Sequence, residues 1–265
     1  AKANPEKAAK MEKWFSGAAP EIDWTGFEQK ANQATRAASA ACLGVIAQQV
    51  ENMVVSSADL SNSDKTDGFL KYTKAITKDD FSGAFLQAGV AELTMACLCL
   101  GMALHGGVLA ACGTFFVFSD YMKPAVRMAA LMELPVKFIW SHDAFRVGED
   151  GPTHEPVEQE AQIRLMEKLK NHSGRNSVLV LRPADVHETT VAYKMMMNNM
   201  LTPTAMILSR QNIKDLPAKE CRLCEAHGAE KGAYVVSSDE NPQVVLLASG
   251  SEVSTLVEAA ELLRA

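Results

Sequence analysis

The most informative absences in this 265-residue sequence concern long apolar runs and clustered charge. The longest apolar run, about residues 95–104, covers about half of the ~20 residues needed to cross a bilayer. Residues 1–6 contain no apolar signal region, and no block of lysine and arginine suits a nucleic acid or a membrane surface. We therefore expect a cytoplasmic protein that has neither a membrane nor a nucleic acid as its partner.

Aromatic residues are also scarce, at 6% of the chain, and neither sign of charge dominates, with 26 Lys and Arg against 32 Asp and Glu. Hydrophobic residues make up 48% of the chain, which is typical of a globular protein with a sizeable core. Because the net charge is −6, an anionic substrate would have to be bound by a few well-placed basic residues.

The six cysteines lie mostly in apolar stretches, as is typical of free thiols in a reducing compartment. Cys221 and Cys224 have CxxC spacing, but a zinc site needs four ligands and no second pair follows. Only His227 lies nearby. We interpret the pair as two incidental thiols in a linker.

Short apolar runs alternate with helical patterns along most of the chain. The runs are residues 53–55, 84–86, 108–110, 136–140, 177–181 and 204–208, and the helical stretches are about 28–50, 91–105, 119–132, 155–169 and 185–199. Apolar strands separated by helices predict an α/β fold, a parallel sheet with helices on both faces. Function in such folds concentrates at the carboxyl ends of the strands.

The pattern divides the chain into four parts. Residues 1–33 are predicted to be a surface extension with Trp14 and Trp24 as anchors, and residues 34–213 to be the α/β domain. Residues 214–235 are polar and charged and predict a linker. Within residues 236–265, the stretch 243–252 predicts a strand, a turn and the start of a helix. We expect this last part to be the incomplete beginning of a second α/β domain.

The loop after the predicted strand 136–140 is rich in groups that can carry protons. Residues 141–154 contain His142, Asp143, Arg146, Asp150 and His154. Histidines beside carboxylates can exchange protons near neutral pH, and the spacing matches no zinc or calcium loop. Spacing alone leaves two interpretations open, a proton-transfer site or a polar turn.

Glu92 opens the apolar helix predicted over residues 91–105. A carboxylate in the first turn of a helix is stabilised by the helix dipole, and this is the more common reason for a glutamate there. A buried glutamate without a partner would be costly, so a ring nitrogen of a bound heterocycle is an alternative partner.

Two further sets of residues are candidates for ligand binding. Phe115, Phe118 and Tyr121 share one helical face, which is more often core than ligand pocket. Arg36, with Ser63, and Arg210 are candidate anion contacts, because arginine suits bidentate phosphate recognition.

Taken together and in order, these segments resemble transketolase. The resemblance is carried by His-Gly-Gly at 105–107, Thr-Phe-x-x-Phe-x-x-Tyr at 114–121, His-Asp at 142–143, Gly-Glu-Asp-Gly-Pro-Thr-His at 148–154 and Leu-Ser-Arg-Gln-Asn at 208–212. It runs from about residue 35 to residue 212, and Ser-Gly-Ser-Glu at 249–252 resembles the start of the family's last domain. Several motifs in a fixed order are hard to obtain by chance.

The resemblance implies a homodimeric enzyme that uses thiamine diphosphate to move a two-carbon ketol unit from a ketose phosphate to an aldose phosphate. Such enzymes hold the diphosphate through Mg²⁺ bound by a Gly-Asp-Gly motif and a later Asn, and this sequence has no such pair. The chain therefore resembles the pyrimidine-binding domain plus the start of the last domain. We expect the magnesium ligands to lie on an N-terminal diphosphate-binding domain or subunit, and this chain alone to be inactive.

The resemblance also assigns roles to individual residues. Glu92 matches the glutamate that contacts the aminopyrimidine ring and promotes its imino tautomer. The other matches are Phe115, Phe118, Tyr121 and Asp59 around the cofactor, His142, Asp150 and His154 at the hydroxyls of the substrate, and Arg36, Ser63 and Arg210 at its phosphate. Glu92, His142 and His154 are the expected catalytic residues, with His154 a candidate for proton transfer.

Some departures and alternatives remain. The family commonly has an arginine where this chain has Ala91, which puts an ion pair near the cofactor in doubt. Dihydroxyacetone synthase would look almost the same, whereas deoxyxylulose phosphate synthase lacks a counterpart of His142. A subunit of a naturally split enzyme and a catalytically silent assembly domain are further alternatives. The retained site residues disfavour the silent domain, and the incomplete last domain disfavours the split enzyme.

Overall fold

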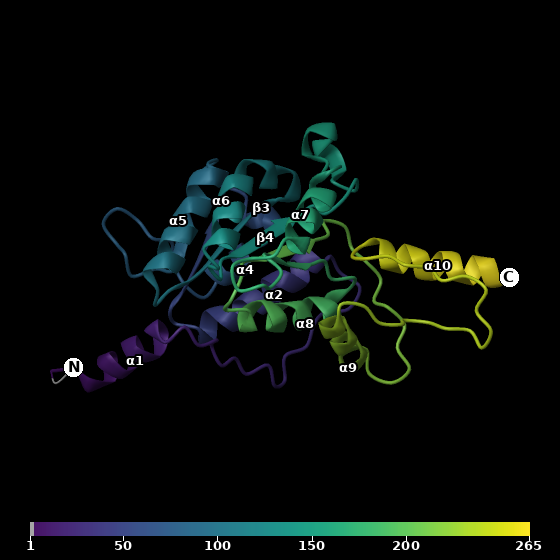
Figure 1. Cartoon of the computed structure of the whole chain (residues 1–265), viewed down its shortest axis with the longest axis horizontal. Helices are drawn as coiled ribbons and strands as arrows, with labels where there is room; N and C mark the ends of the chain where they lie inside the picture. Colours follow the sequence, from purple (N-terminus) through teal and green to yellow (C-terminus); the bar gives the residue numbers. More distant parts are fainter. Residues whose placement is uncertain (1–2) are drawn as a thin grey trace.

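A six-stranded parallel sheet forms the centre of the computed structural model, which describes residues 3–265. The sheet order is β2-β1-β3-β4-β6-β5 (Figure 1). The strands are β1 (Met53–Ser57), β2 (Phe85–Gln87), β3 (Leu109–Phe115), β4 (Lys137–Ser141), β5 (Leu179–Leu181) and β6 (Thr204–Leu208). The predicted α/β fold is confirmed, and each of the six apolar runs contributes a strand.

Helices cover both faces of the sheet (Figure 1). One face is covered by α5 (Glu92–His105), α6 (Ser119–Leu131) and α7 (Gln159–Lys168), and the other by α2 (Thr35–Gln49), α4 (Asp67–Leu70) and α8 (Val186–Asn198). The remaining helices are α1 (Pro5–Phe15), α3 (Ser61–Asp64), α9 (Arg222–Ala226) and α10 (Glu252–Arg264), with 3-10 turns η1 (Phe116–Phe118), η2 (Gly148–Asp150), η3 (Pro152–His154) and η4 (His227–Lys231).

Alternate residues of each central strand belong to different cores. Phe138 and Trp140 of β4 pack under α5 and α6, whereas Ile139 between them packs under α2 and α8. Successive side chains of a strand point to opposite faces, so a strand buried on both faces must be apolar throughout. This requirement is why the central runs in the sequence show no alternation of polar and apolar residues.

Both edges of the sheet are occupied by three-residue strands whose outer sides are covered. At β2, the backbone of Phe85 is bonded on its outer side to Lys74 and Ile76, with N···O distances of 3.2 and 2.7 Å. At β5, side chains of α7 take the place of a neighbouring strand. Glu167 Oε1 accepts from the amide of Val180 at 3.2 Å, and Arg164 Nη1 donates to its carbonyl oxygen at 3.4 Å.

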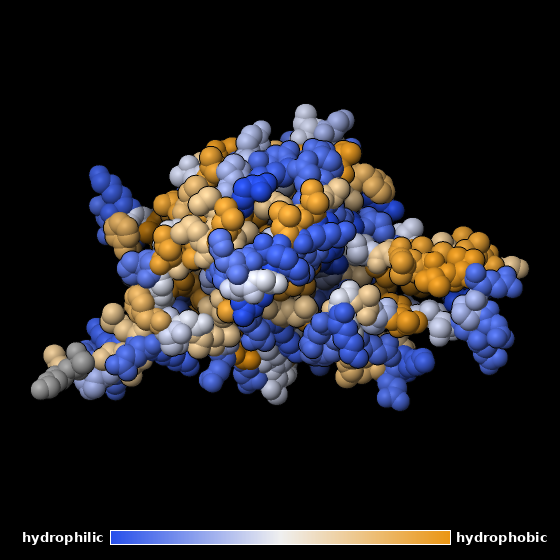
Figure 2. Space-filling model, in the orientation of Figure 1, coloured by the Kyte–Doolittle hydropathy of each residue, from blue (hydrophilic) through white to orange (hydrophobic). Residues whose placement is uncertain are grey.

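The ends of the chain differ from the sequence-based expectation. Trp24 packs against Phe27 and the core under α2, as predicted for an anchor, whereas Trp14 lies on α1, which buries no residue. The strand predicted within residues 243–252 does not form, because no strand of residues 3–265 lies beside it to complete its hydrogen bonds. Its apolar side chains are exposed, and α10 follows with an apolar surface beside the main body (Figures 1 and 2).

Cysteine pairing is a second difference. Cys221 and Cys224 were expected to be free thiols and instead form a disulfide, whereas Cys42, Cys97, Cys99 and Cys112 are free.

Among residues 3–265, no helix combines the length and the apolar character required to cross a membrane.

Lys137, the first residue of β4, is fully buried, and its ammonium group donates to the carbonyl oxygen of Asn199. Burial lowers the pKa of Lys137 from 10.5 to about 7, because a low-dielectric interior disfavours the charged form. Below pH 7 the folded chain therefore bears the cost of a buried charge, and this cost declines as the pH rises toward 10.5.

We predict that Lys137→Met raises the free energy of unfolding by about 1–3 kcal/mol at pH 7, because it removes the desolvation cost. The gain should shrink steadily between pH 7 and pH 10. Urea unfolding across this range measures it, with exposed Lys71→Met as the matched control. A gain that does not change with pH would contradict the explanation.

Candidate functional site

Residues singled out in the sequence lie at or after the carboxyl ends of five of the six strands. Asp59 follows β1, Glu92 follows β2, Phe115 ends β3, His142 follows β4 and Arg210 follows β6. Because all six strands are parallel, these positions lie along one edge of the sheet. After the neighbouring strands β1 and β3 the chain continues to opposite sides of the sheet, to β2 and to β4. Ligands of open α/β sheets bind preferentially at such a change of direction.

Aromatic rings form a wall at the end of β3. The ring of Phe115 lies 3.7 Å from that of His142 between centroids, and 6.0 Å from that of Phe118, to which it is nearly parallel. His154 packs edge-on against Phe115 and Phe118 at 6.0 and 5.3 Å. The structure thus brings together four of the predicted residues. Tyr121 lies at the rim, 62% exposed and 6.3 Å from Phe118.

His142 is buried in this wall with an unusual backbone conformation. Its φ angle is +64°, in the left-handed region that is uncommon for residues other than glycine. Its Nδ1 lies 2.9 Å from the hydroxyl of Ser141. Burial, followed by the nearby charges of Arg36 and Arg210, lowers the pKa of His142 from 6.5 to about 3. The imidazole is therefore neutral at physiological pH, with one nitrogen that donates and one that accepts.

Glu92 is the first residue of α5 and is 7% exposed. Within the described chain, the side chain of Glu92 has one hydrogen bond, a long one in which the hydroxyl of Thr114 donates to Oε1 at 3.4 Å. Thr114 immediately precedes Phe115 on β3, so the carboxylate lies beside the strand that carries the aromatic wall. A buried carboxylate with one weak partner retains most of its hydrogen-bonding capacity for a ligand.

Arg36 and Arg210 come from distant parts of the sequence and are held together by two buried hydroxyl groups. Thr35 Oγ1 accepts from the amide of Ser209 at 2.7 Å, and Ser209 Oγ accepts from the amide of Thr35 at 3.0 Å. Thr35 begins α2 and Ser209 follows β6. This reciprocal pair fixes the positions of the two arginines that come next in each segment.

The two guanidinium groups create a local positive charge. Arg36 Nη1 donates to the carbonyl oxygen of Ser63 at 2.6 Å and to its hydroxyl at 3.2 Å. Arg210 Nη2 lies 3.3 Å from an oxygen of the exposed Glu149. Burial and the charge of Arg210 lower the pKa of Arg36. The carboxylates of Asp64 and of the exposed Asp150 partly offset this lowering of the pKa.

Asp64 was not predicted from the sequence, and it stabilises the loop that carries Ser63. It is fully buried, and its carboxylate accepts from the hydroxyl of Ser57 at 2.8 Å and from the amide and hydroxyl of Thr66 at 2.8 and 2.7 Å. Burial raises the pKa of Asp64 to about 6. It fixes the turn that presents Ser63 to Arg36. In the sequence it is one of several polar residues in a loop, so no signal distinguished it.

Asp143 and Arg182 form a second buried arrangement that the sequence did not reveal. Arg182 Nη2 lies 2.9 Å from Asp143 Oδ2 and 2.6 Å from Glu252 Oε2, and Nη1 lies 2.8 Å from Glu160 Oε2. Ser251 Oγ donates to Asp143 at 2.8 Å. These bonds tie the residue next to His142 to the start of α10.

Asp59, the remaining residue predicted to lie near the cofactor, is not buried among the others. Asp59 is exposed, with a φ angle of +64° at the end of β1. No group of three or more His, Cys, Asp or Glu side chains that could hold a metal occurs within residues 3–265.

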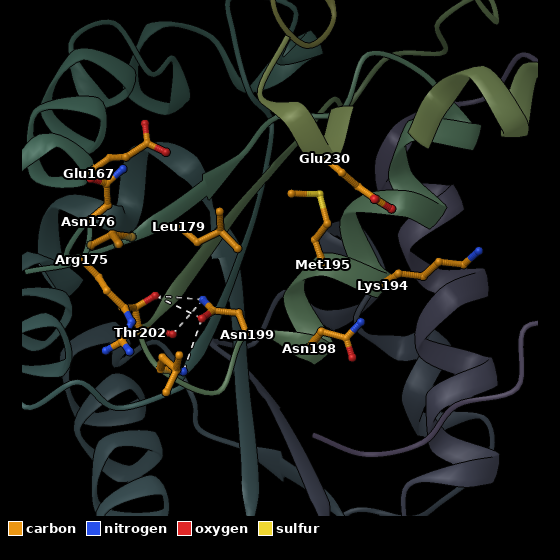
Figure 3. Close-up of a pocket in the computed structure, with 12 residues that line it drawn as sticks. Glu167, Arg175, Asn176, Leu179, Lys194, Met195, Asn198, Asn199, Thr202 and Glu230 are labelled. Atoms are coloured by element: carbon orange, nitrogen blue, oxygen red, sulfur yellow. Dashed lines mark hydrogen bonds between the residues drawn. The ribbon is translucent and has the colours of Figure 1, made fainter. Parts of the chain in front are cut away.

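The candidate site does not coincide with either of two sizeable cavities. One, of about 590 Å³, lies at the opposite edge of the sheet, where Thr202 precedes β6 and Leu179 begins β5 (Figure 3). The amide of Asn199 at its wall is already bonded to Thr202. The other, of about 510 Å³, is lined mainly by α5.

Comparison with known proteins gives one consistent family. A model described as "Transketolase, pyrimidine binding domain" matches residues 31–215, and one described as "Transketolase-like TK C-terminal domain" matches residues 232–265. Transketolase of Bacillus subtilis (strain 168) is 44% identical over 262 residues, which cover 96% of this chain and 37% of that protein. These similarities confirm the resemblance predicted from the motifs.

Solved structures agree. Transketolase from Leishmania mexicana superposes with a TM-score of 0.87 at 34% identity, covering 99% of this chain and 37% of that one. A structure described as "Split gene transketolase, inactive beta4 tetramer" has the same fold, with a TM-score of 0.64 at 24% identity over 88% of this chain and 68% of that one. The chain spans just over a third of the length of the Bacillus and Leishmania proteins.

We predict that His142 remains neutral down to about pH 4. Since the unfolded chain takes up this proton below about pH 6.5 and the folded chain only near pH 3, the group lowers stability as the pH falls through that window. His142→Gln should therefore lose less stability than the parent chain between pH 7 and pH 4.5, by at most about 2–3 kcal/mol.

Imidazole NMR titration and urea unfolding at the two pH values test this prediction. The exposed His172→Gln serves as the matched control. A His142 resonance that titrates near pH 6 would contradict it.

Proposed function

The chain belongs to the transketolase family, and from this premise we propose that it supplies the pyrimidine-side half of a thiamine-diphosphate-dependent site. The proposed reaction transfers a two-carbon ketol unit from a ketose phosphate to an aldose phosphate. The observation that carries the proposal is the convergence, at one sheet edge, of a buried glutamate, an aromatic wall with two histidines and a pair of arginines.

The residues present fit the cofactor. Glu92 is buried, with one weak internal partner, and can hold or move a proton at a ring nitrogen. Phe115, Phe118 and Tyr121 offer apolar faces for a planar ring, and we assign Asp59 to the same environment. When bound, thiamine diphosphate supplies the carbanion chemistry of the reaction.

The sugar phosphate would be oriented by the arginines, Ser63 and His142. Arg36 and Arg210, with the hydroxyl of Ser63, provide charged and neutral donors for a phosphate. His142 is neutral, so it can donate to one sugar hydroxyl or accept from it without the cost of a buried charge.

Asp150 and His154 flank the same loop and are assigned to the remaining hydroxyls. His154 packs against the aromatic wall while remaining only partly buried. That position suits a group that exchanges a proton with the substrate and then with water, and we assign the proton transfer to it.

We assign the ligand set of the diphosphate and its Mg²⁺ to a part outside this chain, because the sequence has no Gly-Asp-Gly motif followed by a later Asn. We propose that a diphosphate-binding domain or subunit provides it, that this chain alone is inactive, and that the complete protein is a cytoplasmic homodimer. A chain that spans just over a third of its relatives is compatible with a shared site of this kind. The fold likeness to a split-gene transketolase supports a separate subunit as an alternative source.

We predict that Glu92→Gln in the complete enzyme lowers ketol transfer by about 10²–10⁴-fold, because glutamine cannot move a proton. Turnover with a ketose phosphate donor measures the effect, with the 265-residue chain alone as an inactive baseline. Glu51→Gln, at the opposite edge of the sheet, serves as the control and should keep normal turnover. Near-normal turnover of Glu92→Gln would remove the assignment.

Arg210→Ala should raise KM for phosphorylated substrates by about 10–100-fold, since a charge-assisted hydrogen bond to phosphate contributes ~1.5–3 kcal/mol. Substrates without phosphate should change little. Arg175→Ala, at the far edge of the sheet, is the matched control. An equal loss on both classes of substrate would contradict a phosphate contact.

A further inference from the structure

The disulfide between Cys221 and Cys224 lies in the segment between the two parts of the chain that the family models match. The two family models match residues 31–215 and 232–265, so the segment between them, with both cysteines, belongs to neither. The Cα atoms are 5.2 Å apart, and both residues are exposed. Of the four free cysteines, Cys42, Cys99 and Cys112 are buried, and Cys97 is exposed.

The disulfide encloses Arg222, which attaches the connecting segment to the α/β domain. The side chain of Arg222 is 8% exposed, and its Nε lies 2.6 Å from Asp185 Oδ2. Its Nη2 lies 3.0 Å from Glu188 Oε1. Asp185 precedes α8 and caps its first turn by accepting from the amide of Glu188 at 2.8 Å. A buried ion pair of this kind is strong only while its geometry is held.

Further bonds of the same cluster depend on this placement. Tyr234 donates its hydroxyl proton to Glu188, and Arg222 Nη2 donates to Tyr234 at 2.6 Å. The amide of Leu216 donates to Asp185 Oδ2 at 3.1 Å. Residues 216–234 are thus bonded to the start of α8 at both of their ends. Cys221 and Cys224 fix the backbone of the short helix α9 from which Arg222 reaches this cluster.

We propose that Cys221–Cys224 is a thiol–disulfide exchange site for small thiol reductants, and that its state sets how firmly residues 216–234 are held on α8. In the reduction, the thiolate of one reductant molecule attacks a sulfur of the pair. The Cys221–Cys224 bond breaks, a mixed disulfide forms, and the other cysteine leaves as a thiolate.

A second reductant thiolate then attacks the mixed disulfide on the reductant's sulfur and releases the second cysteine. The reductant departs as its own disulfide, and the protein gains two electrons and two protons. Both cysteine residues are exposed, so a reductant can reach them, and buried thiols such as Cys42 do not compete.

Reduction should loosen the attachment, because it removes a four-residue covalent loop around Arg222. The loop-closure entropy of so short a loop corresponds to an increase of at most roughly twenty-fold in the population of the locally open state. Two amides should report this opening, that of Leu216, which is bonded to Asp185, and that of Glu225, which is bonded to the carbonyl oxygen of Cys221.

The experiment is amide hydrogen exchange of the full 265-residue chain in glutathione buffers of graded reduced-to-oxidised ratio, with mass-spectrometric counting of free thiols in the same samples. We expect two thiols per chain to become free as the buffer is reduced, together with faster exchange at Leu216 and Glu225. Cys97→Ser should respond as the parent chain does. The double variant Cys221→Ser/Cys224→Ser should exchange fast in every buffer.

Two outcomes would overturn the proposal. One is that Cys221 and Cys224 stay free thiols even in the most oxidising buffer. The other is that exchange at Leu216 and Glu225 is equal in the oxidised and reduced parent chain. The measurement uses the parent chain itself, so it does not depend on a variant folding. Because it involves no turnover, its result is independent of the proposed ketol transfer.

Discussion

The reciprocal hydroxyl bonds between Thr35 and Ser209 are the contact on which the candidate site depends. They join the start of α2 to the end of β6 across 174 residues of sequence, and both side chains are buried. A buried hydroxyl left without a partner is costly, so the two segments hold each other in one register. Arg36 and Arg210 follow these residues directly, and their proximity is a consequence of the pairing.

Two guanidinium groups held together in this way repel each other and affect their surroundings. The pKa of Arg36 falls through burial and through the charge of Arg210, and the pKa of His142 falls through burial and through both arginines. The free chain thus carries an electrostatic cost that a bound dianion would relieve. Together with burial, the same positive charges keep His142 neutral, so the two arginines and the histidine are electrostatically coupled.

The central strands and the positions after them were predictable because burial on both faces leaves an unbroken apolar run in the sequence, as in residues 136–140. Residues 243–252 also contain an apolar run, and a strand was wrongly predicted there. An apolar run forms a strand only beside a partner strand. Asp64 and the pair of Asp143 with Arg182 were missed for a related reason. Their roles come from contacts between segments far apart in the chain, and a local pattern carries no trace of them. Cys221 and Cys224 were noticed, but their spacing alone did not tell a disulfide from two free thiols.

The covered outer sides of β2 and β5 have a consequence for how this domain can associate. An exposed strand edge offers unpaired amide and carbonyl groups on which another chain can add a strand. Here the backbone of residues 74–76 occupies one edge, and Glu167 with Arg164 occupies the other. Growth of the sheet from one molecule into the next is thereby blocked at both ends. Association of this sheet with another molecule therefore has to use its helices and loops, where side chains rather than backbone groups decide which partner is accepted.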